Sequence, residues 1–558
     1  MSKSSEALAI PRAQLRGTRL DGALRLSAWV ERQAPRLLIA AMAAYVIILF
    51  AASVYKYEHF GQGYDQVDFE QALWNTVHGR PFADSRFNFT DSIFGMDWMP
   101  LLAVFVPVYA LLPSALPLFF LQILAAALGA WPVYLLARDK LGTRRHGLVF
   151  GLAWLLYPTI QYAVLDPFQI RIFATTLLLF ALLYFERDRM VPFLITAGLA
   201  LLARTDVALV VLMFGVYALV ARRGARWVIA PLLLGGGYFL LVMTFIVPAF
   251  VHLPEVHCTG PIPPEQIATA WPGSNNPNLG YYLHWGCTPG MILTNLVKNP
   301  LYTLNYMFGD LHKWAYLAAL LAPFTFLSLL NPGRLLLGLP VLGLNLIAWR
   351  GAQINYRTHY QLLITIGVVG AAIAGYAVLE RLIGRPRRLD PAAEITPAGM
   401  EARPDPTAGD VAAATRNLLI WRDGPLLAVL VVALVVNILL VNPVISIVRY
   451  PEPAARVAAA ERLIAMVPPT AQVAASSKLA PRLLPRQYIY NFPPAPYSPY
   501  NMHDFKGLNF ILVDENASAL NELPLGSDVS ALKALDSSPE WALVTEDHDF
   551  RLYARKHR

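Results

Sequence analysis

The sequence of 558 residues contains little charge. Only 15% of its residues are charged and 56% are hydrophobic, whereas about 25% are charged in a typical soluble domain. This shortage excludes an ordinary soluble protein and indicates a polytopic membrane protein. The net charge is +8, but arginines cluster beside apolar runs, at 222–226 and 385–388. Such clusters are typical of cytosolic loops, so they favour membrane orientation over nucleic-acid binding.

Cysteine is nearly absent, and familiar nucleotide and metal motifs are missing. The chain has two cysteines, Cys258 and Cys287, which excludes a zinc site built from cysteines. There is no Walker motif, Rossmann glycine motif or HExxH, so nothing supports an ATP-driven function. Residues 1–36 are polar and rich in arginine, without the apolar core of a cleavable signal. We therefore expect a basic cytosolic tail followed by an uncleaved first span.

Long apolar runs are what the sequence contains instead. A spanning helix needs about 20 mostly apolar residues, and about eleven runs come near this length. The runs are 37–56, 115–137, 147–164, 169–185, 190–204, 205–221, 227–250, 313–330, 334–349, 361–380 and 424–447. With a cytosolic N-terminus, nearly all dense arginine clusters fall inside. The segment 98–113 is short and contains prolines, so we expect an interfacial helix on the outer side.

This orientation divides the chain into regions. We expect a transmembrane domain at 37–383, with outer loops at 57–114 and 251–312, then a disordered cytosolic linker at 384–423. A last span at 424–447 leads to an extracytoplasmic domain at 448–558. That domain alternates helix-like stretches with short aromatic or β-branched runs, and EDHDF (546–550) is typical of a hairpin turn. These patterns predict a small α/β domain.

The two cysteines share the second outer loop. An outer compartment permits oxidation, so we expect a Cys258–Cys287 disulfide that closes a loop of about 30 residues and stabilises the fold by roughly 3 kcal/mol. Two unpaired thiols are the alternative.

Three carboxylates, Asp65, Asp68 and Glu70, follow the first span. A helix starting at Asp65 would gather its apolar residues on one face, which indicates an amphipathic helix on the membrane surface. We expect Asp65 to be the functional carboxylate, because GQG (61–63) lets the backbone bend it toward the membrane mouth. Solvent and the helix dipole suffice to explain Asp68 and Glu70. In the alternative interpretation, Asp65 only caps the helix.

Further polar residues lie at the ends of spans. Asp166, in LDPFQIR (165–171), is either a functional carboxylate or a helix cap followed by Pro167. Arg171 falls in the first turn of an apolar span, where a charge is costly unless it pairs or meets an anionic ligand. Arg204 and Asp206 interrupt an apolar tract. They either form a turn between two short spans or place a cation that holds the phosphate of a lipid carrier.

Basic and aromatic residues complete the candidate site. Lys313, Arg357, His359 and Tyr360 lie at the outer starts of spans. They serve either as interfacial anchors or as a basic wall that faces the carboxylates and holds phosphate oxygens. Aromatic side chains often bind sugars, and Gln71 and Trp74 are further candidate substrate-binding residues.

Several motifs resemble a known family. YDQVDFEQALWNTVHGRPF, WLLYPTIQYAVLDPFQ, RTDVALVVLMFGVYALVARR and THYQLLITIGVVGAA occur in this order. Over roughly residues 40–555 the chain resembles an uncharacterised family of prokaryotic predicted membrane proteins. That family looks like a branch of the GT-C superfamily of polyprenyl-phosphate-sugar-dependent glycosyltransferases. The resemblance implies an all-α polytopic fold of GT-C type, carrying the C-terminal α/β domain.

The resemblance also implies roles for particular residues. GT-C enzymes use an acidic residue in the first outer loop as catalytic base or acceptor-positioning group, and a second acidic residue often lies between the third and fourth spans. Asp65 and Asp166 occupy these places. The family commonly has His where this chain has Asp97 and Gln169, and KED where it has RTD (204–206). Because of these departures, the metal use and the acceptor of the resembled family do not carry over to this chain. His359, by contrast, matches the family.

The function expected from the sequence is therefore that of a glycosyltransferase in the plasma membrane. It would take a sugar from a polyprenyl-phosphate donor and pass it to an acceptor on the outer face. The sequence identifies no cofactor with certainty, and a divalent metal stays open. The alternative is a non-catalytic scaffold or binding protein that presents its outer domain to a partner. A transporter is disfavoured, because the charges collect at the outer face and no inverted repeat is visible.

The predicted orientation can be tested by labelling. A cysteine introduced within 448–558 should react with a membrane-impermeant thiol reagent on whole cells, because the arginine clusters place this region outside. Labelling is measured before and after lysis. Reaction only after lysis would overturn the whole layout.

Overall fold

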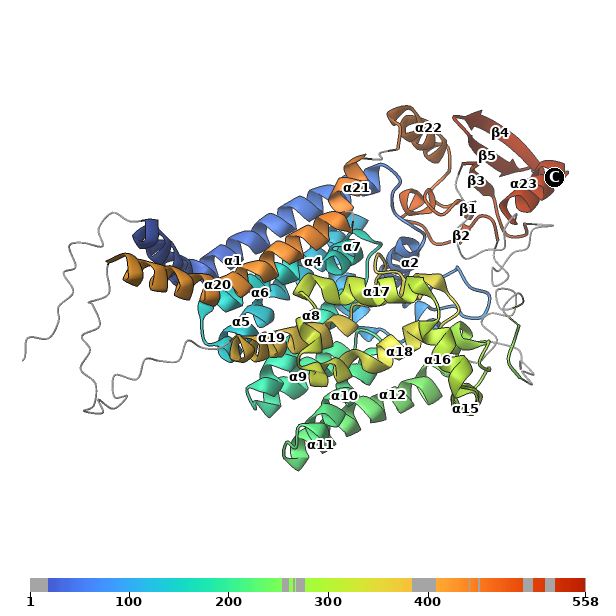
Figure 1. Ribbon diagram of the computed structural model, residues 1–558. Helices are drawn as coiled ribbons and strands as arrows, with labels where there is room; N and C mark the ends of the chain where they lie inside the picture. Colours follow the sequence, from blue (N-terminus) through green and yellow to red (C-terminus); the bar gives the residue numbers. More distant parts are fainter. Residues whose placement is uncertain are drawn as a thin grey trace, which may run out of the picture.

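The computed structural model describes residues 19–252, 260–263, 266, 276–383, 408–440, 442–449, 452–494, 505–516 and 527–556. Helices build a long bundle, and a small sheet domain lies at one end of it (Figure 1). Cys258 lies outside the described residues, so the disulfide with the buried Cys287 stays a prediction. Residues 384–407 of the expected linker also lie outside them.

The N-terminal half is a succession of helices. They are α1 (Arg19–Glu58), α2 (Asp65–Val77), η1 (Ile93–Gly95), η2 (Pro100–Phe105), α3 (Val106–Leu111), α4 (Ala115–Leu128), α5 (Ala130–Leu141), α6 (Arg144–Leu155), α7 (Pro158–Leu165), α8 (Arg171–Glu186), α9 (Met190–Leu201), α10 (Val207–Val220), α11 (Ala225–Pro231), η3 (Leu232–Gly236), α12 (Gly237–Leu241), η4 (Val242–Ile246) and α13 (Val247–Ala249). The helices α11 to α13 follow one another without a gap and form one continuous rod.

The second half of the bundle contains shorter helices. They are η5 (Pro277–Tyr282), α15 (Pro289–Lys298), α16 (Pro300–Phe308), α17 (Leu311–Leu321), η6 (Ala322–Phe324), η7 (Leu327–Leu329), η8 (Pro332–Gly338), α18 (Leu339–Ile347), η9 (Gly351–Ile354), α19 (Ile364–Leu382), α20 (Ala408–Leu439) and α21 (Pro443–Arg449). The helix α20 already begins at Ala408, within the segment expected to be disordered.

Five helical stretches of the described chain are long and apolar enough to cross a membrane. They are Arg25–Glu58, Ala115–Leu141, Ala225–Ala249, Ile364–Leu382 and Gly424–Ile447. The number is six if α6 and α7, bent by 46° at their junction, form one span. Other expected spans are shorter apolar helices, because polar residues and prolines interrupt the runs. Arg204 to Asp206, for example, separate α9 from α10.

The helix α2 forms where it was expected but does not lie on a membrane surface. Phe69 and Leu73 pack into the core of the bundle, whereas Tyr64 and Val67 pack into the C-terminal domain. The expectation of a surface helix is therefore wrong, because the C-terminal domain covers the face that would have met water. Tyr64 precedes the helix and occupies its N-cap position, and its side chain makes no capping hydrogen bond. Asp65 thus does not cap it.

The C-terminal domain is α/β, as predicted. It contains α22 (Ala454–Ala465), β1 (Val473–Ala475), η10 (Ala480–Leu483), β2 (Ile489–Asn491), β3 (Phe510–Asp514), α23 (Ser527–Ser537), β4 (Trp541–Asp547) and β5 (Phe550–Arg555). The strand order is β2-β1-β3-β5-β4, with β1 parallel to β2 and β3. The predicted hairpin turn joins β4 to β5. Its residues His548 and Asp549 have positive φ, as a two-residue hairpin requires.

The edge strand β2 holds the segment that surrounds α2. The Ser85 hydroxyl donates to the Ile489 carbonyl at 2.8 Å and accepts from its N–H at 3.2 Å. Gln71 Nε2 donates to the Gln487 carbonyl at 2.6 Å, and the Tyr64 hydroxyl donates to the Ile489 carbonyl at 2.9 Å. These side chains provide hydrogen-bond partners for backbone groups at the open edge of the sheet. The contacts fix α2 between the bundle and the C-terminal domain.

A close helix contact yields a stability prediction. A Cβ on Gly375 of α19 would lie 1.8 Å from the carbonyl oxygen of Leu327 in η7, whereas one on Gly343 of α18 would meet nothing within 4 Å. We expect Gly375→Ala to destabilise the protein by roughly 1–3 kcal/mol through overpacking, although alanine favours helix. Gly343→Ala is the matched control. Thermal unfolding in detergent measures both, and equal melting temperatures would contradict the contact.

Candidate functional site

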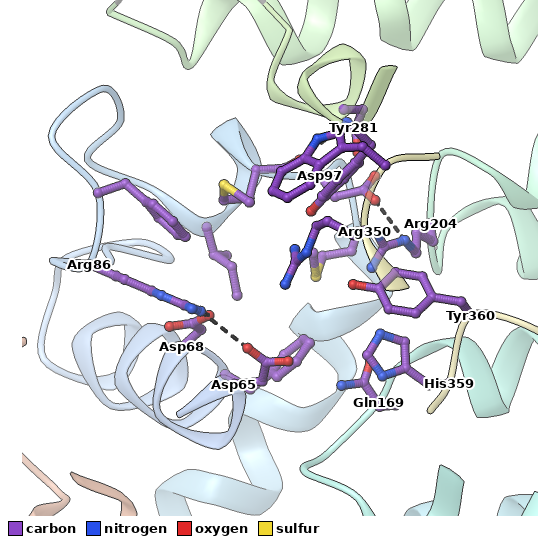
Figure 2. Close-up of a pocket in the computed structure, with 17 residues that line it drawn as sticks. Asp65, Asp68, Arg86, Asp97, Gln169, Arg204, Tyr281, Arg350, His359 and Tyr360 are labelled. Atoms are coloured by element: carbon purple, nitrogen blue, oxygen red, sulfur yellow. Dashed lines mark hydrogen bonds and ion pairs between the residues drawn. The ribbon is translucent and has the colours of Figure 1, made fainter. Parts of the chain in front are cut away.

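A polar cavity of about 130 Å³ lies beside the N-terminal end of α2 (Figure 2). Segments distant in sequence contribute to its wall, because α2, the loops after it, the α7–α8 turn and the α18–α19 connection meet here. Its lining residues are Asp65, Asp68, Phe69, Arg86, Phe87, Ile93, Met96, Asp97, Met99, Gln169, Arg204, Asn278, Tyr281, Trp349, Arg350, His359 and Tyr360.

Arg86 organises the acidic side of the cavity. Its NH1 lies 3.2 Å from Asp65 Oδ1 and 2.6 Å from Asp68 Oδ2. The guanidinium packs over the rings of Tyr64 and Phe87, at 5.0 and 5.1 Å from their centroids. The Asp65 side chain is 50% exposed and that of Asp68 only 14%. One buried cation therefore holds two carboxylates, of which Asp65 is the accessible one.

The two carboxylates differ in pKa. Burial acts to raise the pKa of Asp65, but its interactions with Arg86 above all, and with Arg350, outweigh this and hold the pKa below its usual value. Burial raises the pKa of Asp68 well above its usual value, and the neighbouring acids Asp84 and Asp65 add to this despite Arg86. Asp65 is therefore ionised at neutral pH. Paired carboxyls with separated pKa values are typical of acid–base sites.

Figure 2 shows His359 across the cavity from Asp65. Asp166, outside the cavity lining, pairs with His359. His359 Nδ1 lies 3.4 Å from Asp166 Oδ2. Because a carboxylate accepts, Nδ1 donates and Nε2 is left as an acceptor. Burial lowers the pKa of His359, although the hydrogen bond to Asp166 opposes this. Asp166 follows the last residue of α7, and α8 starts only at Arg171. The alternative of an N-terminal cap with Pro167 is therefore wrong.

A buried charge network forms the opposite wall. Arg204 Nε lies 2.7 Å from Asp97 Oδ2 and 3.6 Å from Asp206 Oδ1. Arg171 Nε donates to Asp206 Oδ2 at 3.1 Å, and its guanidinium packs over the Tyr360 ring at 5.2 Å. Asp97 also accepts from the Thr205 N–H at 3.2 Å. Alternating charges satisfy one another here, as buried ions must. Arg171 NH1 has no hydrogen-bond partner among the described residues.

A second, larger cavity of about 740 Å³ adjoins the first and forms an apolar groove. Its walls include Leu240 and Met243 from the α11–α13 rod, Ile292 and Leu296 from α15, and Leu344 from α18. Five residues line both the polar cavity and the apolar groove, and these are Asp97, Arg204, Asn278, Tyr281 and Tyr360. Arg171 and Asp206 lie at the same end of the groove. An apolar channel therefore ends at two arginines beside the polar cavity.

The structure brings together part of the predicted site. Asp65, Arg204, His359 and Tyr360 line the polar cavity, and Arg171 and Asp206 line the groove. Asp166 is not among the described lining residues of either cavity, but its carboxylate pairs with His359, which lines the polar cavity.

Four other candidates lie elsewhere, in places that suggest structural roles. Lys313 Nζ donates to the Leu346 carbonyl at the end of α18, at 2.8 Å. Arg357 contacts the hydroxyl of its neighbour Tyr356 at 3.1 Å. Gln71 binds the edge strand of the C-terminal domain. Trp74 stacks on His78, with ring centroids 3.9 Å apart.

Sequence reasoning missed several lining residues. The expectation that solvent satisfies Asp68 and Glu70 is wrong, because both side chains are largely buried. The pattern around Arg86 gives no indication of a functional role, since nothing in its local sequence distinguishes it. The sequence did indicate Asp97 and Gln169 as unusual positions, because the resembled family commonly has His at both. Both residues line the cavity together with His359. Within the described residues, no group of three or more His, Cys, Asp or Glu could hold a metal ion.

Comparisons with known proteins agree with this architecture. The family DUF2079, described as predicted membrane protein, matches residues 56–531. The crystal structure of ArnT from Cupriavidus metallidurans bound to undecaprenyl phosphate is similar, with 13% identity, a TM-score of 0.51, and 92% of this chain and 97% of that chain covered. The apo structure of the same protein gives 13% identity and a TM-score of 0.50, covering 95% and 98%. No curated protein matches the chain. The likeness confirms the expected GT-C-like fold.

A buried acid near the site predicts a pH dependence. Burial raises the pKa of Glu70 to about 7 from 4.5, although hydrogen bonds from Gln66 and Tyr109 oppose this. The folded state thus binds the proton more tightly than the unfolded state, so the stability present below about pH 4.5 falls progressively as pH rises and is fully lost once pH exceeds about 7. The full effect is on the order of 3 kcal/mol. We expect Glu70→Gln to remove this loss.

Melting temperatures at pH 5 to 8.5 measure the difference between the wild type and Glu70→Gln. Asp84→Asn is the matched control, because burial raises the pKa of Asp84 only to about 6, and this substitution should leave the loss of stability between pH 6 and 7 in place. An unchanged step in Glu70→Gln would show that another group titrates there.

Proposed function

The chain belongs to the DUF2079 family of predicted membrane proteins, and we propose that it is an integral membrane glycosyltransferase that transfers a sugar from a polyprenyl-phosphate donor to an acceptor. The observation that carries the proposal is the junction of the apolar groove with the polar cavity at Arg204. A lipid-linked phosphate needs this combination, an apolar channel for its chain and cations where the chain ends. The likeness to ArnT bound to undecaprenyl phosphate supports it.

In this proposal Arg204 and Arg171 bind the donor phosphate. Arg204 lines both spaces, and Arg171 NH1 is a buried donor without a partner among the described residues. A phosphate oxygen would satisfy it, since guanidinium and phosphate form strong charge-assisted hydrogen bonds. Asp97 and Asp206 hold the two arginines in place before the donor arrives. Such preorganised charge stabilises a leaving phosphate by several kcal/mol.

Asp65 acts as the general base. The acceptor oxygen attacks the anomeric carbon of the sugar, its proton passes to the Asp65 carboxylate, and the bond from that carbon to the phosphate oxygen breaks. The polyprenyl phosphate leaves with the bonding electrons, facing Arg204. Asp65 is suited to this role because it is ionised and the more exposed of the two acids. His359 orients the bound sugar or acceptor, and Asp166 positions His359.

The same proposal places the reaction at the outer face of the membrane. The basic tail and arginine-rich loops lie in the cytosol, and the C-terminal domain lies outside the plasma membrane. The cavity is next to that domain because α2, which carries Asp65, packs against it. The acceptor is then reached from the outer face.

Donor binding can be measured directly. We expect purified protein to bind undecaprenyl phosphate in native mass spectrometry and Arg204→Gln to weaken binding about tenfold, the effect of losing one charged hydrogen bond. Arg187→Gln is the matched control, because Arg187 pairs with Asp139 in a different part of the bundle. Equal binding by both variants would refute the phosphate site. Melting temperatures verify that the variants are folded.

Catalysis is tested at Asp65. Asp65→Asn keeps the side-chain shape but cannot accept the proton, so transfer should fall by about two orders of magnitude or more, while folding and lipid binding persist. Transfer is measured in vesicles with membrane extract as the source of donor and acceptor. Full activity in Asp65→Asn would contradict the general-base role. If the wild type binds the lipid but no transfer occurs in any extract, the scaffold alternative is favoured.

A further inference from the structure

The helices α15 and α16 expose an apolar surface outside the spanning stretches. Residues 289–308 contain a single charged side chain, Lys298. The solvent-exposed fraction is between 53% and 82% for five large side chains of this pair, which are Leu293, Val297, Leu301, Tyr302 and Leu304. Exposed apolar surface of this density is not tolerated in water and marks contact with protein or lipid.

The pair is too short to cross a membrane. The helix α15 has 10 residues and α16 has 9, so each is about 15 Å long, half of the hydrocarbon thickness of about 30 Å. Pro300 begins α16 directly after Asn299, and the joint separates the two helices. An apolar surface on such short helices fits the interfacial region of one leaflet.

The surface continues into the expected lipid-facing side of the bundle. The α11–α13 rod exposes Leu240 and Phe245 by 65% and 68%. Leu240 from this rod and Leu293 from α15 line the same apolar groove, and Figure 1 shows α15 and α16 at the end of the rod. Leu293 is both exposed and groove-lining, so it lies at the rim. The partly exposed Tyr302 and Trp314 add aromatic side chains of the kind enriched at membrane interfaces.

We propose that α15 and α16 are immersed in the leaflet on the side of the C-terminal domain, with lipid acyl chains as their partner, and that they form the lip through which the groove opens to the bilayer. The sequence alone places this segment in an aqueous loop. The proposal depends on exposure, on helix length and on continuity with the α11–α13 rod and the groove, so it holds whether or not the protein is a glycosyltransferase. The occupant is lipid because the surface is continuous with that of a stretch long enough to span.

Three leucines allow an internally matched test on the native protein in lipid nanodiscs. Leu301 is the test residue, Leu240 reports the membrane, and Leu543 reports water, since it is 49% exposed on β4 of the C-terminal domain. The protein is labelled with a diazirine reagent that partitions into lipid and, separately, with hydroxyl radicals in water. Mass spectrometry of peptides quantifies both labels at each leucine.

We expect Leu301 to match Leu240 within about twofold in lipid-phase labelling and to be labelled about tenfold less than Leu543 by hydroxyl radicals, as burial in a leaflet requires. Labelling of Leu301 like Leu543 would overturn the proposal. Protection from both reagents would also overturn it, because protein, such as a second copy, would then cover the face.

A pair of variants confirms the assignment. Leu301→Asp should lower lipid-phase labelling of 289–308 about tenfold, because an aspartate in the apolar region costs a few kcal/mol. Leu543→Asp should leave that labelling unchanged. Melting temperatures verify folding, and unchanged labelling in folded Leu301→Asp would overturn the proposal. Because no readout involves transfer, failure here is distinguishable from failure of the proposed function.

Discussion

The ion pair between Arg204 and Asp97 is the contact on which the site depends. It lies where the polar cavity meets the apolar groove, and both residues line both spaces. A guanidinium at this depth is costly unless it is paired, and the partner comes from a loop far earlier in the chain. The pairing therefore ties the α9–α10 break to the loop after α2, and through Asp206 it extends to Arg171 on α8.

The second constraint is the fixation of α2. Asp65 and Asp68 share Arg86, and the residue before Arg86 completes the edge of strand β2. The described part of the C-terminal domain thus acts on the cavity while contributing no residue to its lining. It covers the outer face of α2, satisfies its polar side chains and holds the loop that carries Arg86. This explains why an acidic cluster can be buried close to an apolar bundle.

These two constraints also separate the roles of similar residues. Asp65 and Asp68 are one helical turn apart, yet the pKa of one lies below its usual value and that of the other well above it. Exposure to the cavity and the positive charges of Arg86 and Arg350 account for Asp65, whereas burial beside Asp84 accounts for Asp68. Asp166 and His359 show the same division, since only His359 reaches the cavity. Proximity in sequence says nothing about such differences, because they arise from what packs around each group.

Sequence patterns correctly predicted the membrane character, the helical class, the α/β nature of the C-terminal region with its EDHDF turn, and the start of α2 at Asp65. Each follows from local composition or periodicity, which needs no partner. The sequence also indicated Arg171, Arg204 and His359, because charges in apolar surroundings stand out. Only the tertiary structure decided that Lys313 caps α18, that Asp68 and Glu70 are buried, and that Arg86, Asp97 and Arg350 line the cavity. Those outcomes depend on contacts between segments that lie from tens to hundreds of residues apart, such as Arg86 with Asp68 and Gln71 with Gln487, and hydropathy and spacing carry no record of such contacts.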